Sequence, residues 1–263
     1  ARRTVGAGDY VRFAVIKRVL ARRAGEDSAA RMFMDEARIN SELHHENIAQ
    51  VYDFGFQEEE FYLAMEYVPG MDLRVAQKAL RRLGRRVPIR VVLTVLDQVL
   101  AGLSYAHGAV DTLGQPMRIV HRDINPRNVM LSTRGDVKII DFGLAKALDE
   151  NPSKTLIICG TPLYMSPEQI VGEDVDERTD IFSLGVVLYE MLALQRPFVG
   201  DTTHQIAHQI LVVDPTPPDE IRSKVPGDLA VICGKAMDKD PERRYGSMAE
   251  LAADLSRHLA SKP

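Results

Sequence analysis

Three short polar motifs in the middle of the chain have side chains that could hold a metal ion. The longest is His121-Arg122-Asp123-Ile124-Asn125-Pro126-Arg127-Asn128. Asp141-Phe142-Gly143 begins eighteen residues after Asp123, and Ser166-Pro167-Glu168 ends twenty-seven residues after Asp141. Carboxylate and amide oxygens of this kind are the ligands that Mg²⁺ prefers. Isolated Asp and Asn residues more often stabilise turns, so the order and spacing of the three motifs are what point to chemistry.

In this order and spacing, the three motifs resemble the catalytic loop, the metal-binding D-F-G and the A-P-E motif of the eukaryotic-type protein kinases. The resemblance covers nearly the whole chain. The insert over 108–118 is longer than usual in the family and, together with Asn125, resembles the bacterial Ser/Thr kinase subgroup. The resemblance implies transfer of the γ-phosphoryl group of ATP, with Mg²⁺, to hydroxyl groups of proteins. Asp123 would then accept the proton of the substrate hydroxyl, and Asn128 and Asp141 would bind the Mg²⁺.

The same resemblance assigns an ion pair to the first part of the chain. The apolar run Phe13-Ala14-Val15-Ile16 leads directly into Lys17 and resembles the family's V-A-I-K strand. Glu36, nineteen residues later in a helical pattern, would pair with Lys17 and hold it against the α- and β-phosphates. Most Lys and Glu residues are simply exposed, and for Glu36 the assignment depends mainly on the family match.

The segment Tyr62–Gly70 resembles the hinge that holds the adenine base. Met65 would stand beside the adenine pocket, and the backbone carbonyl of Glu66 and the amide of Val68 would pair with the base. Met130 would form the apolar floor below it. These residues could equally be the core residues of an edge strand, and the sequence leaves both interpretations open.

Two further assignments concern the framework of the larger lobe. Asp180 lies in a segment that resembles the helix anchoring the catalytic loop through its backbone. Arg244 matches the Arg that pairs with the Glu of A-P-E, which is Glu168 here. A buried pair of this kind is structural, and removal of one partner typically costs about 3–5 kcal/mol.

The loop that covers the phosphates departs from the family pattern. Gly6 and Gly8 begin a G-x-G-x-x-G motif, but Val11 occupies the position of the third glycine. Only eleven residues separate Gly6 from Lys17, too few for the rest of the loop, a second strand, a turn and a third strand. Either the loop is shortened or residues are missing near Gly8, and we favour the second interpretation.

The catalytic loop also departs from the family. Most serine/threonine kinases have Lys two residues after the catalytic Asp, where this chain has Asn125. Arg127, four residues after Asp123, occupies the position at which many tyrosine kinases have a substituting Arg. We expect Arg127 to neutralise the γ-phosphate.

Serine/threonine specificity is predicted instead by Cys159–Glu168, which resembles G-T-x-x-Y-x-x-P-E. Thr161 would hydrogen-bond the catalytic Asp. Residues 147–158 would be the activation segment, in which Thr155 is the first candidate phosphorylation site and Ser153 the second. Both could instead be ordinary solvated loop hydroxyls. Arg122 would bind the phosphorylated residue.

Hydrophobic patterning predicts the elements that must position these residues. Strand-like runs over 13–16, 48–55 and 60–67 and one helix over 28–43 form a first region, and helices over 91–107, 179–194, 227–237 and 248–259 dominate the rest. Short strands are expected at Ile119-Val120 and 137–140. We predict an α+β, two-lobed kinase fold, with a small antiparallel N-lobe over 1–68 and a larger helical C-lobe over 69–263.

Composition excludes several classes of protein. The 263 residues carry 33 Lys and Arg against 37 Asp and Glu, a net charge of −4, with no sustained basic block, which disfavours nucleic-acid binding. The chain contains no run of about 18 apolar residues, so no membrane span is predicted. Two cysteines favour a reducing compartment, so we expect a cytoplasmic location, or the cytoplasmic face of a membrane if a longer parent chain has an anchor.

Expected partners are protein substrates and a second kinase copy for trans-autophosphorylation. The main alternative function is a nucleotide-binding pseudokinase scaffold, suggested by the incomplete glycine loop and Asn125. A small-molecule kinase of the same fold ranks last, because such enzymes normally lack a segment like 161–168. The chain begins with Ala, so we interpret it as a domain of a longer protein.

Overall fold

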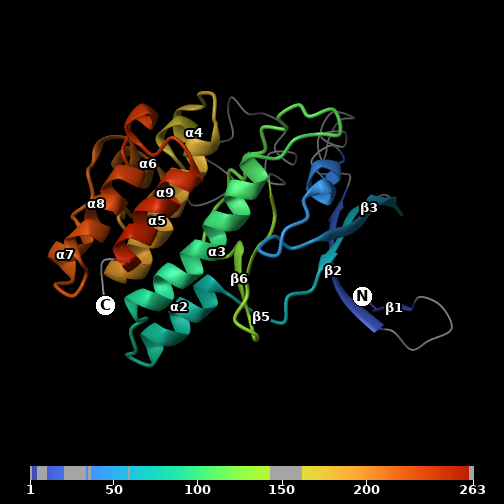
Figure 1. Ribbon diagram of the computed structural model, residues 1–263, viewed down its shortest axis with the longest axis horizontal. Coiled ribbons are helices and arrows are strands. Elements are labelled where there is room, and N and C mark those ends of the chain that lie inside the picture. Colours follow the sequence, from blue (N-terminus) through green and yellow to red (C-terminus); the bar gives the residue numbers. More distant parts are fainter. Residues whose placement is uncertain are drawn as a thin grey trace.

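The structure is a computed structural model that describes residues 2–4, 11–20, 34, 37–58, 60–142 and 162–260. A small sheet formed by the first part of the chain and a larger helical region formed by the rest lie at opposite ends of the molecule (Figure 1). This arrangement confirms the predicted α+β, two-lobed architecture.

The small sheet consists, in its described part, of strands β1 (Arg2–Thr4), β2 (Val11–Leu20), β3 (Val51–Gln57) and β4 (Glu60–Glu66). Its order is β1-β2-β4-β3, and all neighbours are antiparallel. Alternate residues of β4 are buried, as the twofold period of a strand requires. They pack with Ala37 of the helical segment 37–42 into a small core, which comprises Ala37, Val51, Phe61, Leu63 and Met65.

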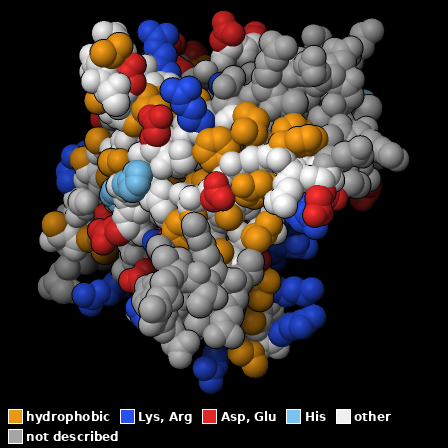
Figure 2. Space-filling view, turned by 90° about the vertical axis from the view of Figure 1, so that its right-hand side faces the viewer, with side chains coloured by type: hydrophobic (Ala, Val, Ile, Leu, Met, Phe, Trp, Pro, Cys, Tyr) orange, Lys and Arg blue, Asp and Glu red, His pale blue; other side chains and the backbone are white. Residues whose placement is uncertain are grey.

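β1 and β2 are direct neighbours, with Thr4 opposite Val11. No described strand lies between them, so the printed sequence builds this part of the sheet with one strand fewer than the family pattern. Gly6 and Gly8 belong to the joining residues 5–10, which lie outside the described part of the chain. Figure 2 looks at the end of the molecule that carries this sheet and shows hydrophobic side chains gathered across the middle of the face.

A second sheet joins the two regions. Strands β5 (Gly70–Asp72), β6 (Val129–Ser132) and β7 (Val137–Ile139) pair antiparallel in that order. Gly70 approaches β6 so closely that a Cβ there would lie 1.9 Å from the Leu131 carbonyl oxygen. Only glycine fits this contact, which places the end of the predicted hinge against the strand that follows the catalytic loop.

The larger region is built from helices α2 (Leu73–Arg82), α3 (Ile89–His107), α4 (Pro167–Val171), α5 (Glu177–Ala193), α6 (Thr203–Val212), α7 (Pro218–Ile221), α8 (Gly227–Ala236) and α9 (Met248–Ala260), with a 3₁₀ turn η2 (Pro241–Arg243). α5 is the central helix, since every residue from Thr179 to Ala193 is buried. It packs against α3, α7, α8 and α9. A helix buried on all sides provides a rigid base for any loop that it anchors.

Within the described residues, α3 is the one helix long and apolar enough to cross a membrane by length and composition. It packs against α9, α5 and β7, and many of its apolar side chains lie in the main core. We therefore interpret α3 as a core helix.

The expected elements are largely present, with shifts at their ends. β2 continues past Lys17 to Leu20, and Ile48 forms only an isolated bridge with Ile139 before β3 begins at Val51. The strand predicted at Ile119-Val120 is wrong, because these residues are irregular and no described strand pairs with them. Ile119 is 8% exposed in the main core, so its apolar character reflects core packing.

Candidate active site

Asp123 lies in the irregular segment that joins the end of the 108–118 insert to β6, and its carboxylate is held by two side-chain amides. Asn125 Nδ2 donates to Asp123 Oδ1 and Asn128 Nδ2 donates to Oδ2, both at 2.8 Å. The same amides also donate to the Asp123 carbonyl. The residue itself is exposed. Each carboxylate oxygen thus has one fixed donor while the group remains open to an incoming hydroxyl.

The segment is anchored from below by Asp180 of α5, whose carboxylate is fully buried. Its Oδ1 accepts from the Arg122 amide at 2.8 Å, and Oδ2 accepts from the His121 amide at 2.8 Å. His107 Nε2, at the end of α3, also lies 2.8 Å from Oδ2. The buried charge is therefore fully paired with donors, and it fixes the backbone just before Asp123.

Asp141 follows β7 and joins the two lobes electrostatically. Lys17 of β2 forms an ion pair with Asp141 Oδ2. Asp141 has a left-handed backbone (φ 65°), an uncommon conformation for a residue with a side chain, which must be held by its surroundings. The Ile140 amide donates to the Asn128 carbonyl at 3.0 Å, so Asp141 lies beside the catalytic segment.

Two oxygens at this point fit a hard cation. Asp141 Oδ1 is buried and has no hydrogen-bond partner among the described residues. Asn128 uses its Nδ2 group on Asp123, and no hydrogen bond to its Oδ1 is found in the described part of the chain. A buried, unpaired carboxylate oxygen and an unpaired amide oxygen suit Mg²⁺, which takes few protein ligands together with phosphate and water.

The predicted hinge follows β4. Met65 is buried, with Val15 of β2 on one side and Val51 of β3 on the other. The Glu66 carboxylate accepts a hydrogen bond from the Gln50 amide, and its Oε2 lies 3.0 Å from Lys138 Nζ. Val68 is buried, and its N–H makes no hydrogen bond among the described residues. Met130 is half-buried on β6, the strand that follows Asn128.

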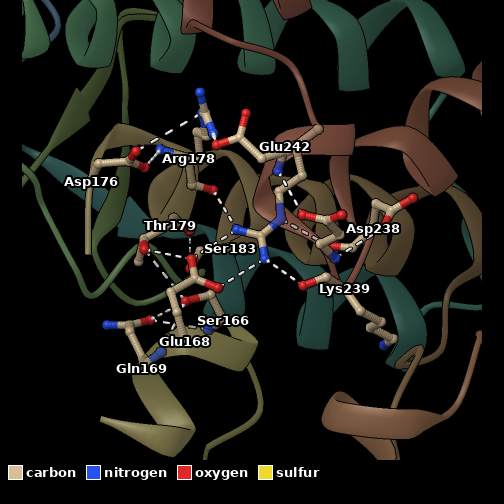
Figure 3. A network of polar contacts seen from close by, with 12 residues as sticks. Ser166, Glu168, Gln169, Asp176, Arg178, Thr179, Ser183, Asp238, Lys239 and Glu242 are labelled. Atoms are coloured by element: carbon tan, nitrogen blue, oxygen red, sulfur yellow. Dashed lines mark hydrogen bonds and ion pairs between the residues drawn. The ribbon is translucent and has the colours of Figure 1, made fainter. Parts of the chain in front are cut away.

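Glu168 and Arg244 form a bidentate pair with both N···O distances at 2.8 Å (Figure 3). Thr179 Oγ1 adds a third hydrogen bond to Glu168 at 2.7 Å. Burial raises the pKa of the Glu168 carboxyl, but the hydrogen bonds and charge of Arg244, with the Thr179 bond, outweigh it and lower this pKa to about 2. The pair ties α4 to α5 and to the turn after η2.

Other partly buried polar contacts were not predicted from the sequence. Gln169 Nε2 of α4 donates to the Arg122 carbonyl at 2.8 Å, and its Oε1 caps its own helix at Ser166. Glu190 of α5 is 4% exposed and accepts from Tyr164 Oη at 2.7 Å and from Arg81 Nη2 at 3.0 Å. These polar residues join segments far apart in the sequence, so no local pattern reveals them.

The structure thus brings Lys17, Asp123, Asn128 and Asp141 together and places Asp180 beneath them. The Arg127 side chain is exposed near Asp123 and makes no contact among the described residues. The remaining predicted site residues lie outside the described part of the chain, namely Gly6, Gly8, Glu36, Ser153, Thr155 and Thr161.

Known proteins have sequences similar to this chain. The serine/threonine-protein kinase PknB of Mycobacterium leprae is 38% identical over 237 residues, which cover 88% of this chain and 36% of PknB. The tyrosine-protein kinase MasK of Myxococcus xanthus is 41% identical over 262 residues, which cover 97% of this chain and 40% of MasK. The chain therefore spans about two fifths or less of the length of these relatives.

Solved structures of protein kinase domains have a similar fold. The crystal structure of the Mycobacterium tuberculosis PknI kinase domain superposes with a TM-score of 0.71 at 26% identity and covers 93% of this chain and 85% of its own. Residues 6–256 match the family described as protein kinase domain, which spans almost the whole sequence. The chain belongs to the protein kinase domain family.

Proposed function

We propose that this chain is the catalytic domain of an ATP-dependent kinase that phosphorylates serine and threonine hydroxyls of proteins. The observation that carries the proposal is a series of contacts. Lys17 pairs with Asp141, the amide of the neighbouring Ile140 donates to the Asn128 carbonyl, and Asn128 Nδ2 donates to Asp123. These contacts support a site in which a cation, two candidate metal ligands and a carboxylate base act together, as phosphoryl transfer requires.

In this proposal the adenine base lies between Met65 and Met130 and pairs with the Glu66 carbonyl and the Val68 amide. Lys17 binds the α- and β-phosphates, with Glu36 as its partner and the backbone at Gly6 and Gly8 above. Asp141 and Asn128 hold Mg²⁺, which when bound neutralises charge on the phosphates. Lys17 then exchanges its ion pair with Asp141 for the nucleotide.

Asp123 would act as the base. The acceptor hydroxyl oxygen forms a bond to the γ-phosphorus, the bond to the β,γ-bridging oxygen breaks, ADP leaves, and the hydroxyl proton passes to Asp123. Asn125 and Asn128 orient the carboxylate for this role. Arg127 would neutralise charge on the transferred group, and Thr161, which lies outside the described residues, would hydrogen-bond Asp123.

Serine and threonine are the proposed acceptors because residues 159–168 follow the pattern of kinases that act on them. MasK, at 41% identity, is named a tyrosine kinase, so acceptor identity is part of the test. Proposed partners are protein substrates and a second copy of the kinase that phosphorylates Thr155 or Ser153. Since ATP is the donor, we place the domain in the cytoplasm, free or at a membrane.

The test is phosphate transfer from labelled ATP with Mg²⁺, with and without a basic acceptor protein, followed by phosphoamino-acid analysis and site mapping. We expect phosphoserine or phosphothreonine, with label in the 147–158 segment, and loss of both in Asp123→Asn and Lys17→Ala. Phosphotyrosine alone would contradict the acceptor assignment. ATP binding without any transfer would favour the scaffold function suggested by Asn125.

A further inference from the structure

Asn40 is a buried polar residue in apolar surroundings. It is 7% exposed and lines a small cavity between the helical segment 37–42, the small sheet and the end of β7. Apart from Asn40 and Asp141, the side chains around this cavity are apolar, among them Leu63, Met65 and Ile139. A buried amide in such surroundings is costly unless its hydrogen bonds are made.

The Asn40 amide makes one such bond. Its Nδ2 donates to the Phe142 carbonyl oxygen at 2.7 Å, and the contact is buried. Phe142 directly follows Asp141, and its ring packs against His121 with 4.6 Å between ring centroids. The bond therefore connects the helical segment of the small lobe to the residue after the proposed metal ligand.

The backbone before Asp141 is held independently. The Ile139 amide donates to the Asn47 carbonyl at 2.8 Å, and the Ile139 carbonyl accepts from the Ala49 amide at 2.9 Å. The Ile140 amide donates to the Asn128 carbonyl. After Asp141, the bond from Asn40 is the one polar contact to the Phe142 carbonyl that the described residues provide. Asp141, with its left-handed backbone, thus lies between two fixed points, and Asn40 supplies the second.

We propose that Asn40 is a positioning residue for Asp141, fixing through the Phe142 carbonyl the backbone that aims the unpaired Asp141 Oδ1 at Mg²⁺. This inference rests on the proposed function, because it takes Asp141 as the metal ligand. It assigns to the helical segment 37–42 a direct part in metal binding, in addition to any ion pair made by Glu36.

The test uses Asn40→Leu, which suits the apolar cavity but removes the donor, and Asn40→Ala as a smaller change. ADP affinity is measured with and without Mg²⁺ for each protein. We expect the Mg²⁺-dependent gain in ADP affinity to fall roughly three- to tenfold, as loss of one buried hydrogen bond would produce. Affinity for ADP without Mg²⁺ should stay within about twofold, because the base and Lys17 contacts remain.

Asn47→Leu is the matched control. Asn47 is also buried and donates from Nδ2 to a β7 carbonyl, that of Val137, at 2.9 Å, but this contact lies upstream of Asp141. We expect it to lower the melting temperature. The Mg²⁺-dependent gain should stay intact, because the Asn47 backbone carbonyl that accepts from Ile139 is kept in this variant. An unchanged gain in both Asn40 variants, or an equal loss in Asn47→Leu, would overturn the positioning role.

The outcomes separate this inference from the proposed function. A parent protein that binds ADP with a Mg²⁺-dependent gain but transfers no phosphate would contradict kinase activity, while the Asn40 variants would still decide the positioning role. A parent protein without any Mg²⁺-dependent gain would overturn both, since Asp141 would then hold no metal ion.

Discussion

At the scale of single residues, we propose that Arg127 supplies the positive charge that Asn125, at the position of the family's lysine, does not provide. Its side chain is exposed and uncommitted, and it lies four residues after Asp123. Removing one group that stabilises transition-state charge typically lowers kcat about 100-fold or more. We therefore expect Arg127→Ala to lower kcat by about that factor, measured as phosphate transfer at saturating ATP.

Arg134→Ala provides the control, since Arg134 is an exposed arginine in the turn between β6 and β7. It changes the net charge equally and should leave kcat within about twofold, because scattered surface charges are screened by solvent. Full turnover by Arg127→Ala would show that the γ-phosphate charge is neutralised by another group.

The lowered pKa of Glu168 predicts that the folded protein loses stability in acid. This pKa is lowered from 4.5 to about 2 in the folded protein, so the ionised form stabilises the fold above about pH 4.5. This contribution, about 3 kcal/mol, is lost as the pH falls toward 2. Between pH 6 and pH 3 we expect the unfolding free energy of Glu168→Gln to fall by about 2 kcal/mol less than that of the parent protein.

Urea unfolding at each pH measures this difference, and Glu42→Gln is the control. Glu42 is 46% exposed in its side chain and makes only a long contact with Arg38, so its substitution should reproduce the parent's pH dependence. Parallel curves for the parent and Glu168→Gln would show that the Arg244 pair does not depress the Glu168 pKa.

At the scale of elements, the buried Glu190 links α2, α5 and the segment before α4. Burial and the charge of Glu190 raise the Tyr164 pKa, so the phenol remains a donor through the physiological pH range. Tyr164→Phe would leave Glu190 with Arg81 alone. A hydrogen bond to a buried charge contributes about 1.5–3 kcal/mol, so we expect the unfolding free energy to fall by about 2 kcal/mol.

Tyr105→Phe is the comparison for this prediction, because the Tyr105 hydroxyl only accepts an exposed amide, that of His44, at 3.3 Å. Its effect should remain below about 0.5 kcal/mol by denaturant unfolding. Equal effects of the two substitutions would mean that Glu190 does not depend on the Tyr164 hydroxyl.

The elements that sequence patterning located are those with a strong local signal. β4 alternates buried and exposed residues, and α5 is a long apolar run, so both were predicted within two residues of their ends. The strand predicted at Ile119-Val120 was wrong because a buried irregular segment can have the same apolar composition as a short strand. The α2 helix was not predicted. It is highly charged and has only Leu73 buried, so it lacks the apolar run that marks α3 and α5.

The residues of the candidate site also divide into those with a local sequence signal and those without one. Asp123, Asn128 and Asp141 belong to compact motifs whose spacing can be read directly. Asn40, by contrast, contacts a residue 102 positions away, and Gln169 contacts one 47 positions away. A buried amide that supports such a segment looks like any polar residue of an amphipathic helix, and only the packed structure reveals its partner.

At the scale of the whole molecule, several polar contacts among the described residues join the two lobes, and Lys17 with Asp141 lies at the proposed nucleotide site. A nucleotide held by both lobes binds the folded protein and not the unfolded chain. At about 100 times its Kd it should therefore add about 2.7 kcal/mol to the unfolding free energy. For a domain of this size, that corresponds to a rise in Tm of roughly 5–10 °C.

Asp141→Asn separates the part of this stabilisation that depends on Mg²⁺, because an amide in place of the carboxylate binds a hard cation weakly. We expect ADP with Mg²⁺ to raise the Tm of the parent more than ADP with EDTA does, and Asp141→Asn to show the same small rise under both conditions. If the variant keeps the full Mg²⁺ effect, the metal ion is held by other residues and Asp141 serves only as the partner of Lys17. Differential scanning fluorimetry on the two proteins decides between these roles, because it reports binding whether or not phosphate is transferred.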